Sequence, residues 1–318
     1  MRVLLWHVHG AWTTAFVRGR HEYLIPVTVD RGPDGLGRAR TYPWPPAAVE
    51  VTREEAAAAE VDAIVLQRPH ELHGLAAEWL GGRRPARDLP AVYLEHNAPQ
   101  GRIAEMRHVA ADRDDLVVVH VTHFNDLFWD CGGTRTRVIE HGVVDPGYRY
   151  TGELASAAVV INQPARRGRV TGTDLLRRLG AAVPVDLFGM GAERLAGTAG
   201  VRPVGDLPQD RLHPEMARRR LYLHPIRWTS LGLALLEAMH LGIPVVALAT
   251  TEVAEAVPAE AGVLSTRVEV LAEAAGRLAA DPELARRMGK AARTAALSRY
   301  GLERFLADWD RLLDEVAA

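Results

Sequence analysis

The chain carries the stretch Thr229-Ser-Leu-Gly-Leu-Ala-Leu-Leu-Glu237-Ala-Met-His-Leu-Gly-Ile-Pro-Val-Val246, and this stretch decides its fold. Residues 231–241 are rich in Leu and Ala, which favours a helix. Thr229 or Ser230 is a good N-cap for that helix, because a hydroxyl oxygen can accept a hydrogen bond from a free first-turn amide. Gly242 and Pro244 end the helix, and the apolar run that follows, 244–249, is typical of a buried parallel strand.

A second apolar run, 220–225, comes shortly before the helix and predicts another strand. The N-terminus of a helix that follows a strand binds anions, because the free amides and the helix dipole both face the ligand. Glu237 lies about two turns into the helix, where its carboxylate could accept hydrogen bonds from sugar hydroxyls. The stretch therefore predicts an anion site with a carboxylate nearby.

These residues resemble the C-terminal half of the large retaining glycosyltransferase family with the GT-B fold, of the family-4 type. That family has a Glu-x7-Glu pattern on this helix, followed by Ala-Met and a Gly-x-Pro-Val-Val turn. Glu237 stands at the second Glu, and the resemblance implies that it contacts the nucleotide ribose. The resemblance also implies that four backbone amides meet the diphosphate or the sugar of the donor, those of Ser230, Leu231, Gly232 and Leu233.

Thr229 replaces the first Glu of the pattern. In the family that carboxylate usually contacts the transferred sugar. A hydroxyl in its place removes a charge-assisted hydrogen bond, which is roughly twice as strong as a neutral one. Thr229 is therefore either a plain N-cap or a weaker contact to the donor sugar. An altered donor preference, a reduced activity and another residue in the same role all stay open.

Length and composition narrow the class of protein. A chain of 318 residues usually makes two domains, and a hydrophobic content of 48% suffices for substantial cores. The formal charge of −2 shows no basic excess, so nucleic acid is not an expected partner. Cys131 is the single cysteine, which excludes an intramolecular disulfide and fits a cytoplasmic location. No apolar run reaches the ~20 residues of a membrane span, and peripheral membrane contact stays open.

Both halves of the chain alternate apolar runs with helix-like stretches, which predicts βαβ units and parallel sheets. The pattern restarts near residue 145. Two such halves describe the GT-B architecture, in which two Rossmann-like domains face an interdomain cleft. We expect an acceptor-side domain at 1–148, a donor-side domain at 149–297 and a terminal helix at 298–318 that crosses back to the first domain. The other predicted strands are 2–8, 61–66, 90–94, 116–121, 137–139, 157–161, 185–188 and 262–266, and the other predicted helices include 54–60, 70–80, 173–179, 268–280 and 282–297.

The resemblance places basic side chains after the first strand of the second half. The family has Gly-Arg there and a Lys a few residues later, and these groups bind the donor diphosphate. Asn162-Gln163 and Thr171 stand at those positions here. Arg166 and Arg169 are our candidates for the catalytic role, because a guanidinium suits phosphate, and Arg227 is a further one. A solvated basic loop is the alternative.

Two more donor-side candidates follow from the same resemblance. Gly189, in Phe188-Gly-Met-Gly191, matches a Gly-x-Gly of the family and is expected at the nucleotide base pocket. Glu255 follows Thr250-Thr251, which replaces a Gly-Gly pair near the donor sugar and makes the pocket floor bulkier. Glu255 either contacts the donor or is structural.

In the first half, the family has a glycine-rich loop after its first strand that touches donor phosphate and acceptor. His9, Gly10 and Thr13 are our candidates for this acceptor or phosphate loop. His7 and His9 would point the same way on a strand, but no acidic or cysteine cluster completes a site, so we expect no metal. His96 ends another strand, where the family often has a His close to the donor sugar, and is a catalytic candidate. Its rivals are His120, His123 and His141.

The sequence thus predicts a metal-independent glycosyltransferase that moves a sugar from a nucleoside-diphosphate sugar to an unknown sugar, lipid or small-molecule acceptor. Retention of configuration is implied by the resemblance alone, and no cofactor is expected besides the donor itself. Two alternatives stay open. One is a GT-B-like binding or scaffold subunit without transfer activity, which the motif departures motivate. The other is a different GT-B enzyme, such as a sugar-nucleotide epimerase.

Overall fold

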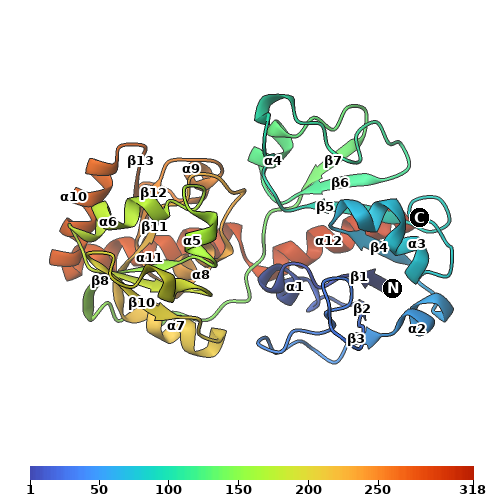
Figure 1. Cartoon of the computed structure of the whole chain (residues 1–318), viewed down its shortest axis with the longest axis horizontal. Helices are drawn as coiled ribbons and strands as arrows, with labels where there is room; N and C mark the ends of the chain where they lie inside the picture. Colours follow the sequence, from blue (N-terminus) through green and yellow to red (C-terminus); the bar gives the residue numbers. More distant parts are fainter. The chain divides into compact units, whose positions relative to one another are not determined.

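A computed structural model describes the whole chain, Met1–Ala318. The chain divides into two compact units (Figure 1). The first unit is Met1–Val144 with Leu302–Ala318, and the second is Asp145–Gly301. Each unit is built on one all-parallel sheet. The predicted α/β class with two Rossmann-like domains is confirmed, and the units break at residues 144 and 301 where the sequence placed the breaks at 148 and 297.

The first unit holds a seven-stranded sheet in the order β3-β2-β1-β4-β5-β6-β7. Its strands are β1 (Arg2–Leu5), β2 (Glu22–Pro26), β3 (Ala48–Val51), β4 (Ala63–Leu66), β5 (Ala91–Glu95), β6 (Val117–His120) and β7 (Arg135–Val138). Its helices are α1 (Gly10–Phe16), α2 (Arg53–Ala58), η1 (Glu71–Leu75), α3 (Ala76–Trp79), η2 (Ile103–Glu105), α4 (His123–Phe128) and α12 (Leu302–Ala317). The strand order reverses between β1 and β4, and open α/β sheets bind ligands at the carboxyl ends of the strands beside such a reversal.

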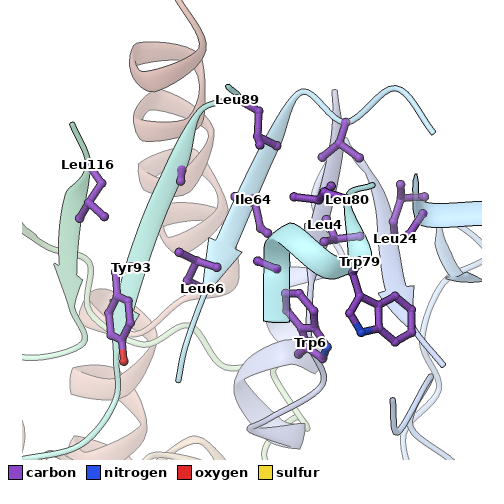
Figure 2. Close-up of a cluster of buried hydrophobic side chains, with 14 of the residues drawn as sticks. Leu4, Trp6, Leu24, Ile64, Leu66, Trp79, Leu80, Leu89, Tyr93 and Leu116 are labelled. Atoms are coloured by element: carbon purple, nitrogen blue, oxygen red, sulfur yellow. The ribbon is translucent and has the colours of Figure 1, made fainter. Parts of the chain in front are cut away.

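One face of this sheet packs against the helices between β3 and β5 (Figure 2). Leu4, Ile64 and Leu66 project from neighbouring strands and are fully buried. The indole rings of Trp6 and Trp79 meet edge to face at 6.2 Å. Because both faces of the sheet are covered, the central strands are apolar without alternation, which is why the sequence predicted them.

The other face carries α1 and the C-terminal helix α12, drawn in blue and red in Figure 1. The ring centroids of Phe305 and Trp309 lie 6.0 and 5.6 Å from that of Trp12. A Cβ on Gly142 would come within 2.4 Å of the Phe305 side chain, so the chain after β7 needs a glycine where α12 crosses it. Helix α12 is therefore an integral part of the first unit.

The second unit holds a six-stranded sheet in the order β10-β9-β8-β11-β12-β13. Its strands are β8 (Leu154–Val160), β9 (Val185–Phe188), β10 (Val201–Gly205), β11 (Arg219–His224), β12 (Val245–Leu248) and β13 (Gly262–Ser265). Its helices are α5 (Pro164–Arg167), η3 (Thr173–Leu175), α6 (Leu176–Gly180), η4 (Ala192–Leu195), α7 (Gln209–Arg218), α8 (Leu233–Leu241), α9 (Val253–Ala256), α10 (Val268–Ala280) and α11 (Pro282–Arg299). The strand order reverses between β8 and β11.

Most predicted elements are confirmed, and α10 has the predicted bounds. The sequence missed β2, β3 and β10. The predicted helix over 70–80 is a π-helical turn followed by one α-helical turn, because Gly74 has a non-helical φ of 164°. No helix of the chain combines the length and the apolar character needed to cross a bilayer.

Candidate functional site

The N-terminus of α8 lies just past the strand-order reversal of the second unit. The predicted N-cap is wrong: the cap residue is Gly232, with φ −77° and ψ 119°, which has no side chain to cap the helix. Thr229 and Ser230 lie in the preceding loop, where Ser230 and Leu231 are buried and Thr229 is half-buried. Since the first amides of a helix have no partner within it, the N-terminus of α8 can offer them to an anion.

His224 lies directly beneath this helix end. It is 1% exposed, and neither ring nitrogen has a hydrogen-bond partner. A Cβ on Gly232 would come 2.8 Å from its Cε1 atom, so the glycine allows α8 to start over the ring. Burial lowers the pKa of His224 to about 4, which keeps the imidazole neutral at pH 7. The sequence analysis did not single out this residue, although a histidine at the end of the strand before α8 was the available signal.

Glu237 is 8% exposed and faces helix α7. Its Oε1 atom accepts a hydrogen bond from Nε2 of Gln209 at 3.1 Å. Its Oε2 atom lies 3.4 Å from Nε2 of His213. Both partners come from α7, and no sequence pattern linked that helix to Glu237. The ribose contact of Glu237 stays a prediction, and Gln209 would share the carboxylate with it.

The arginines after β8 differ in their partners. Arg166 is exposed and forms no ion pair. The pKa of the neighbouring Arg167 is lowered, mainly by burial and secondly by the charge of Arg166. Arg169 lies 3.5 Å from the Asp174 carboxylate. Arg227 holds both oxygens of the same carboxylate, at 2.5 and 2.9 Å. Arg166 is therefore the guanidinium most available to a ligand.

Thr171, at the position of the family's Lys, is fully buried. Its hydroxyl donates a hydrogen bond to the Gly168 carbonyl at 3.2 Å and lies 3.1 Å from the Thr173 hydroxyl. It therefore stabilises the turn after α5, and Arg166 at the surface is left to supply positive charge there.

The ends of β8 and β9 are joined by side-chain and backbone bonds. Oδ1 of Asn162 accepts from the Met190 amide at 3.0 Å, and the Gln163 amide donates to the Met190 carbonyl at 2.7 Å. Gly189 has φ 116°, and a Cβ there would come 2.5 Å from the Ile161 carbonyl oxygen. Gln163 itself is left-handed, with φ 55°. Gly189 thus allows the close approach of the two strand ends, and its contact with a nucleotide base stays a prediction.

Glu255 lies on α9 with its side chain exposed, and its backbone carbonyl accepts a hydrogen bond from Arg299. The buried acid of this segment is Glu252, which is 2% exposed and pairs with Arg299 at 3.2 Å. Thr251 has φ 52°, a left-handed conformation that is rare for a β-branched residue. The backbone therefore keeps a shape that suits glycine although the glycine has been replaced.

In the first unit, His7 and His9 do not share a strand as predicted, because β1 ends at Leu5 and His9 is the N-cap of α1. The His7 ring packs on Trp44 with centroids 4.7 Å apart, whereas the His9 ring lies 3.9 Å from that of His96. The two imidazoles therefore face different partners. Thr13 is fully buried, and its hydroxyl donates to the His9 carbonyl at 2.9 Å.

Gly10 is the first residue of α1, and a Cβ there would come 3.1 Å from the ring of Tyr42. Within the predicted acceptor loop, the His9 side chain and the Gly10 backbone therefore face other loops.

His96 follows β5 and is held by Gln67, which follows β4. Nε2 of Gln67 donates to the Trp6 carbonyl at 2.7 Å, so its Oε1 atom faces Nε2 of His96 at 3.1 Å. An amide oxygen only accepts, so Nε2 of His96 carries the ring proton. Burial, then the neighbouring His9 and His141, lower the pKa of His96 well below its usual range. Burial also lowers the pKa of His141 to about 3 and that of His9 to about 4.

The structure therefore brings His9, His96 and His141 together as a neutral imidazole cluster, which we call the histidine cluster. The other rivals lie apart from it. His120 is buried with Nε2 3.6 Å from Sγ of Cys131, and His123 is exposed on α4.

Comparison with known proteins gives the family of part of this chain. Residues 192–295 match the family model for Glycosyl transferases group 1. This match lies in the second unit and covers less than half of the chain, and the predicted glycosyltransferase is confirmed. The comparison with curated protein sequences found no match.

Solved structures agree on the fold. Sucrose-phosphate synthase from Thermosynechococcus elongatus is 17% identical, with 99% of this chain and 98% of that chain covered and a TM-score of 0.71. Anabaena HepE, solved in complex with UDP-glucose, is 16% identical, with 99% and 100% covered and a TM-score of 0.74. TarM from S. aureus, solved with UDP and glycan ligands, is 14% identical, with 79% and 55% covered and a TM-score of 0.60. These likenesses confirm the predicted GT-B fold.

Proposed function

We propose that this chain, which contains a glycosyl transferases group 1 domain, transfers a sugar from a nucleoside-diphosphate donor with retention of configuration and without a metal ion. The observation that carries the proposal is the N-terminus of α8, which starts at a glycine, with the buried carboxylate of Glu237 on the same helix. The free amides suit the diphosphate, and the carboxylate suits the ribose hydroxyls. The resemblance of the Glu237 motif supports retention.

In the reaction, the bond from the anomeric carbon to the diphosphate oxygen breaks, a bond from that carbon to the acceptor oxygen forms, and the proton of the acceptor hydroxyl passes to the leaving diphosphate. Negative charge grows on the diphosphate as it leaves. The α8 amides and Arg166 would stabilise this charge in place of a cation. His96, neutral and held by Gln67, is the catalytic candidate on the first unit, and it would hydrogen-bond sugar hydroxyls.

The donor base we propose is uracil. Anabaena HepE was solved with UDP-glucose, and TarM was solved with UDP. Both cover most of this chain at the level of fold, which supports the same nucleotide without deciding the sugar.

The test is a thermal-shift series with UDP, GDP, ADP and dTDP, repeated with EDTA and with Mg²⁺. A ligand at 100 times its Kd stabilises by about 2.7 kcal/mol, which moves Tm by roughly 5–10 °C for a domain of this size. A shift with UDP in EDTA supports the donor site and its independence of metal. A shift with another base only, or only with Mg²⁺, contradicts that part of the proposal. NMR of the glycoside product then reads the anomeric configuration.

A second candidate is a binding subunit without transfer activity. Thr229 in place of a carboxylate and the buried Thr171 favour it. UDP-sugar binding without release of UDP, across a panel of sugar, lipid and small-molecule acceptors, would support this candidate.

A further inference from the structure

A cavity of about 390 Å³ lies in the first unit, between the carboxyl ends of β4 and β5 and the segment 98–109. Its walls include Arg68, Tyr93, Glu95, His108 and Trp129. Its volume is within the range of small-molecule sites, which are mostly apolar with a few placed polar groups. None of the candidate residues described above lines it, and its composition indicates which ligand it takes.

The cavity contains a carboxylate without a cationic partner. Nε2 of His108 lies 3.2 Å from Oε2 of Glu95, and Nδ1 of His108 accepts a hydrogen bond from the Ala110 amide at 3.1 Å. A nitrogen that accepts carries no proton, so His108 donates to Glu95 through Nε2 as a neutral imidazole. Oε1 of Glu95 also accepts a hydrogen bond from the Asn97 amide at 2.7 Å. The charge of Glu95 is therefore held in place by two hydrogen bonds and is not neutralised.

The arginines of the cavity do not change this balance. Arg68 pairs with Asp34 and Glu71, and Arg107 pairs with Asp112 and lies 3.5 Å from Asp130. Each guanidinium thus faces two carboxylates. The electrostatic environment of the cavity is negative and would repel a phosphate or a carboxylate ligand.

Aromatic rings make the other wall. The Trp129 indole N–H donates to the Asn97 carbonyl at 2.8 Å, and its ring stands perpendicular to His108 at 5.2 Å. The ring centroid of Tyr93 lies 4.9 Å from that of His108. The Tyr93 hydroxyl points away from the apolar cluster in Figure 2. Nη2 of Arg68 is buried and has no acceptor, and an unpaired buried donor is costly.

We propose that this cavity binds the acceptor, and that the acceptor is a neutral pyranose sugar. The sugar ring would lie against Trp129, and its hydroxyls would donate to Glu95 and accept from Arg68. Gln67 lines the cavity and also bonds His96, so the cavity wall is continuous with the histidine cluster. The assignment as acceptor rests on the proposed glycosyl transfer, whereas the sugar-binding site itself does not.

The test uses ligand-observed saturation-transfer NMR on the full chain, with methyl glucoside, methyl galactoside and methyl mannoside as neutral probes and glucose 6-phosphate as the anionic one. At least one neutral probe should give a signal in the wild type, and the phosphate should not. Trp129→Ala should weaken binding at least tenfold, and Trp129→Phe, which keeps a ring, should restore most of it. Glu95→Gln should strengthen glucose 6-phosphate binding, because one of the repelling charges is removed.

Three results would overturn the proposal: no signal from any neutral probe, a signal that Trp129→Ala leaves unchanged, or a wild-type preference for the phosphate. UDP binding is measured on the same samples as a separate readout and should be unchanged in all three variants. If the wild type binds a neutral sugar but does not bind UDP, the proposed function alone is refuted. Intact UDP binding without sugar binding would refute the cavity assignment alone.

Discussion

Glu237→Ala separates a ligand-binding carboxylate from a structural one. In the folded protein the carboxylate accepts one hydrogen bond, from the half-buried Gln209, and lies 3.4 Å from His213. The Gln209 amide can turn to water when its acceptor is removed, so the variant should lose only about 1 kcal/mol of unfolding free energy. For a domain of this size that lowers Tm by roughly 2–4 °C.

The loss of ligand binding should be larger. Hydrogen bonds to a charged group contribute about 1.5–3 kcal/mol, and every 1.4 kcal/mol is a factor of about ten in Kd. Glu237→Ala should therefore raise the Kd for UDP about 10- to 100-fold. Glu237→Gln keeps an acceptor oxygen but no charge, so its Kd for UDP should lie between those of Glu237→Ala and the wild type.

Isothermal titration with UDP and with UMP, beside a thermal melt, measures both effects. Glu273→Ala, on the exposed face of α10, is the matched control, and it should change neither Kd nor Tm. A Kd for Glu237→Ala within twofold of the wild type would refute the ribose assignment. A Tm lowered by more than about 10 °C would instead show that the carboxylate serves the fold.

Four further predictions follow from the structure. Arg166→Ala should weaken UDP about tenfold and leave uridine unchanged, whereas Arg169→Ala should have a smaller effect because Asp174 already holds that guanidinium; equal effects in titration would contradict the ranking. The added methyl group of Gly232→Ala should push against the His224 ring, and the variant should lose more free energy of UDP binding than of unfolding. An unchanged Kd for UDP would count against the α8 site. Trp309→Ala should cost the first unit about 3–5 kcal/mol in urea unfolding, and a loss below 1 kcal/mol would be incompatible with the packing seen. The pKa of His224, about 4 when folded against 6.5 for the free side chain, means that the unfolded state binds the proton first, so the contribution of His224 to the unfolding free energy should fall as pH drops from 6.5 to 4, by on the order of 3 kcal/mol; the same slope in His224→Gln as in the wild type would contradict this.

The strands at the centre of each sheet could be predicted because both of their faces are buried. β6, Val-Val-Val-His, is buried along its whole length, and three of its four residues are valine. The missed strands lie at the edge of a sheet, as β3 and β10 do, or next to an edge strand, as β2 does. β10 is an edge strand of the six-stranded sheet and contains Arg202 and Pro203, and β3 is an edge strand of the seven-stranded sheet and contains Glu50. An edge strand is partly solvated, so its sequence carries no unbroken apolar run.

The candidate site shows the same limit. The sequence placed Glu237 on its helix correctly, since that depends on residues within one element. Its partners on α7 could not be predicted, because they depend on how two helices pack. Thr229 illustrates a local error: a hydroxyl near a helix start suggests a cap, but Gly232 lies closer to the buried His224 and starts the helix.

The first unit is completed by a helix that is made after the whole second unit. Residues 1–301 are synthesised before α12, and they include the whole second unit but leave the first without the helix that covers Trp12 and Phe16. Domains usually fold in the order of synthesis, and here that order is reversed in part. The growing chain therefore carries an exposed aromatic surface through the synthesis of residues 145–301. Chaperone binding and aggregation of the growing chain should both be greatest while residues 145–301 are being made.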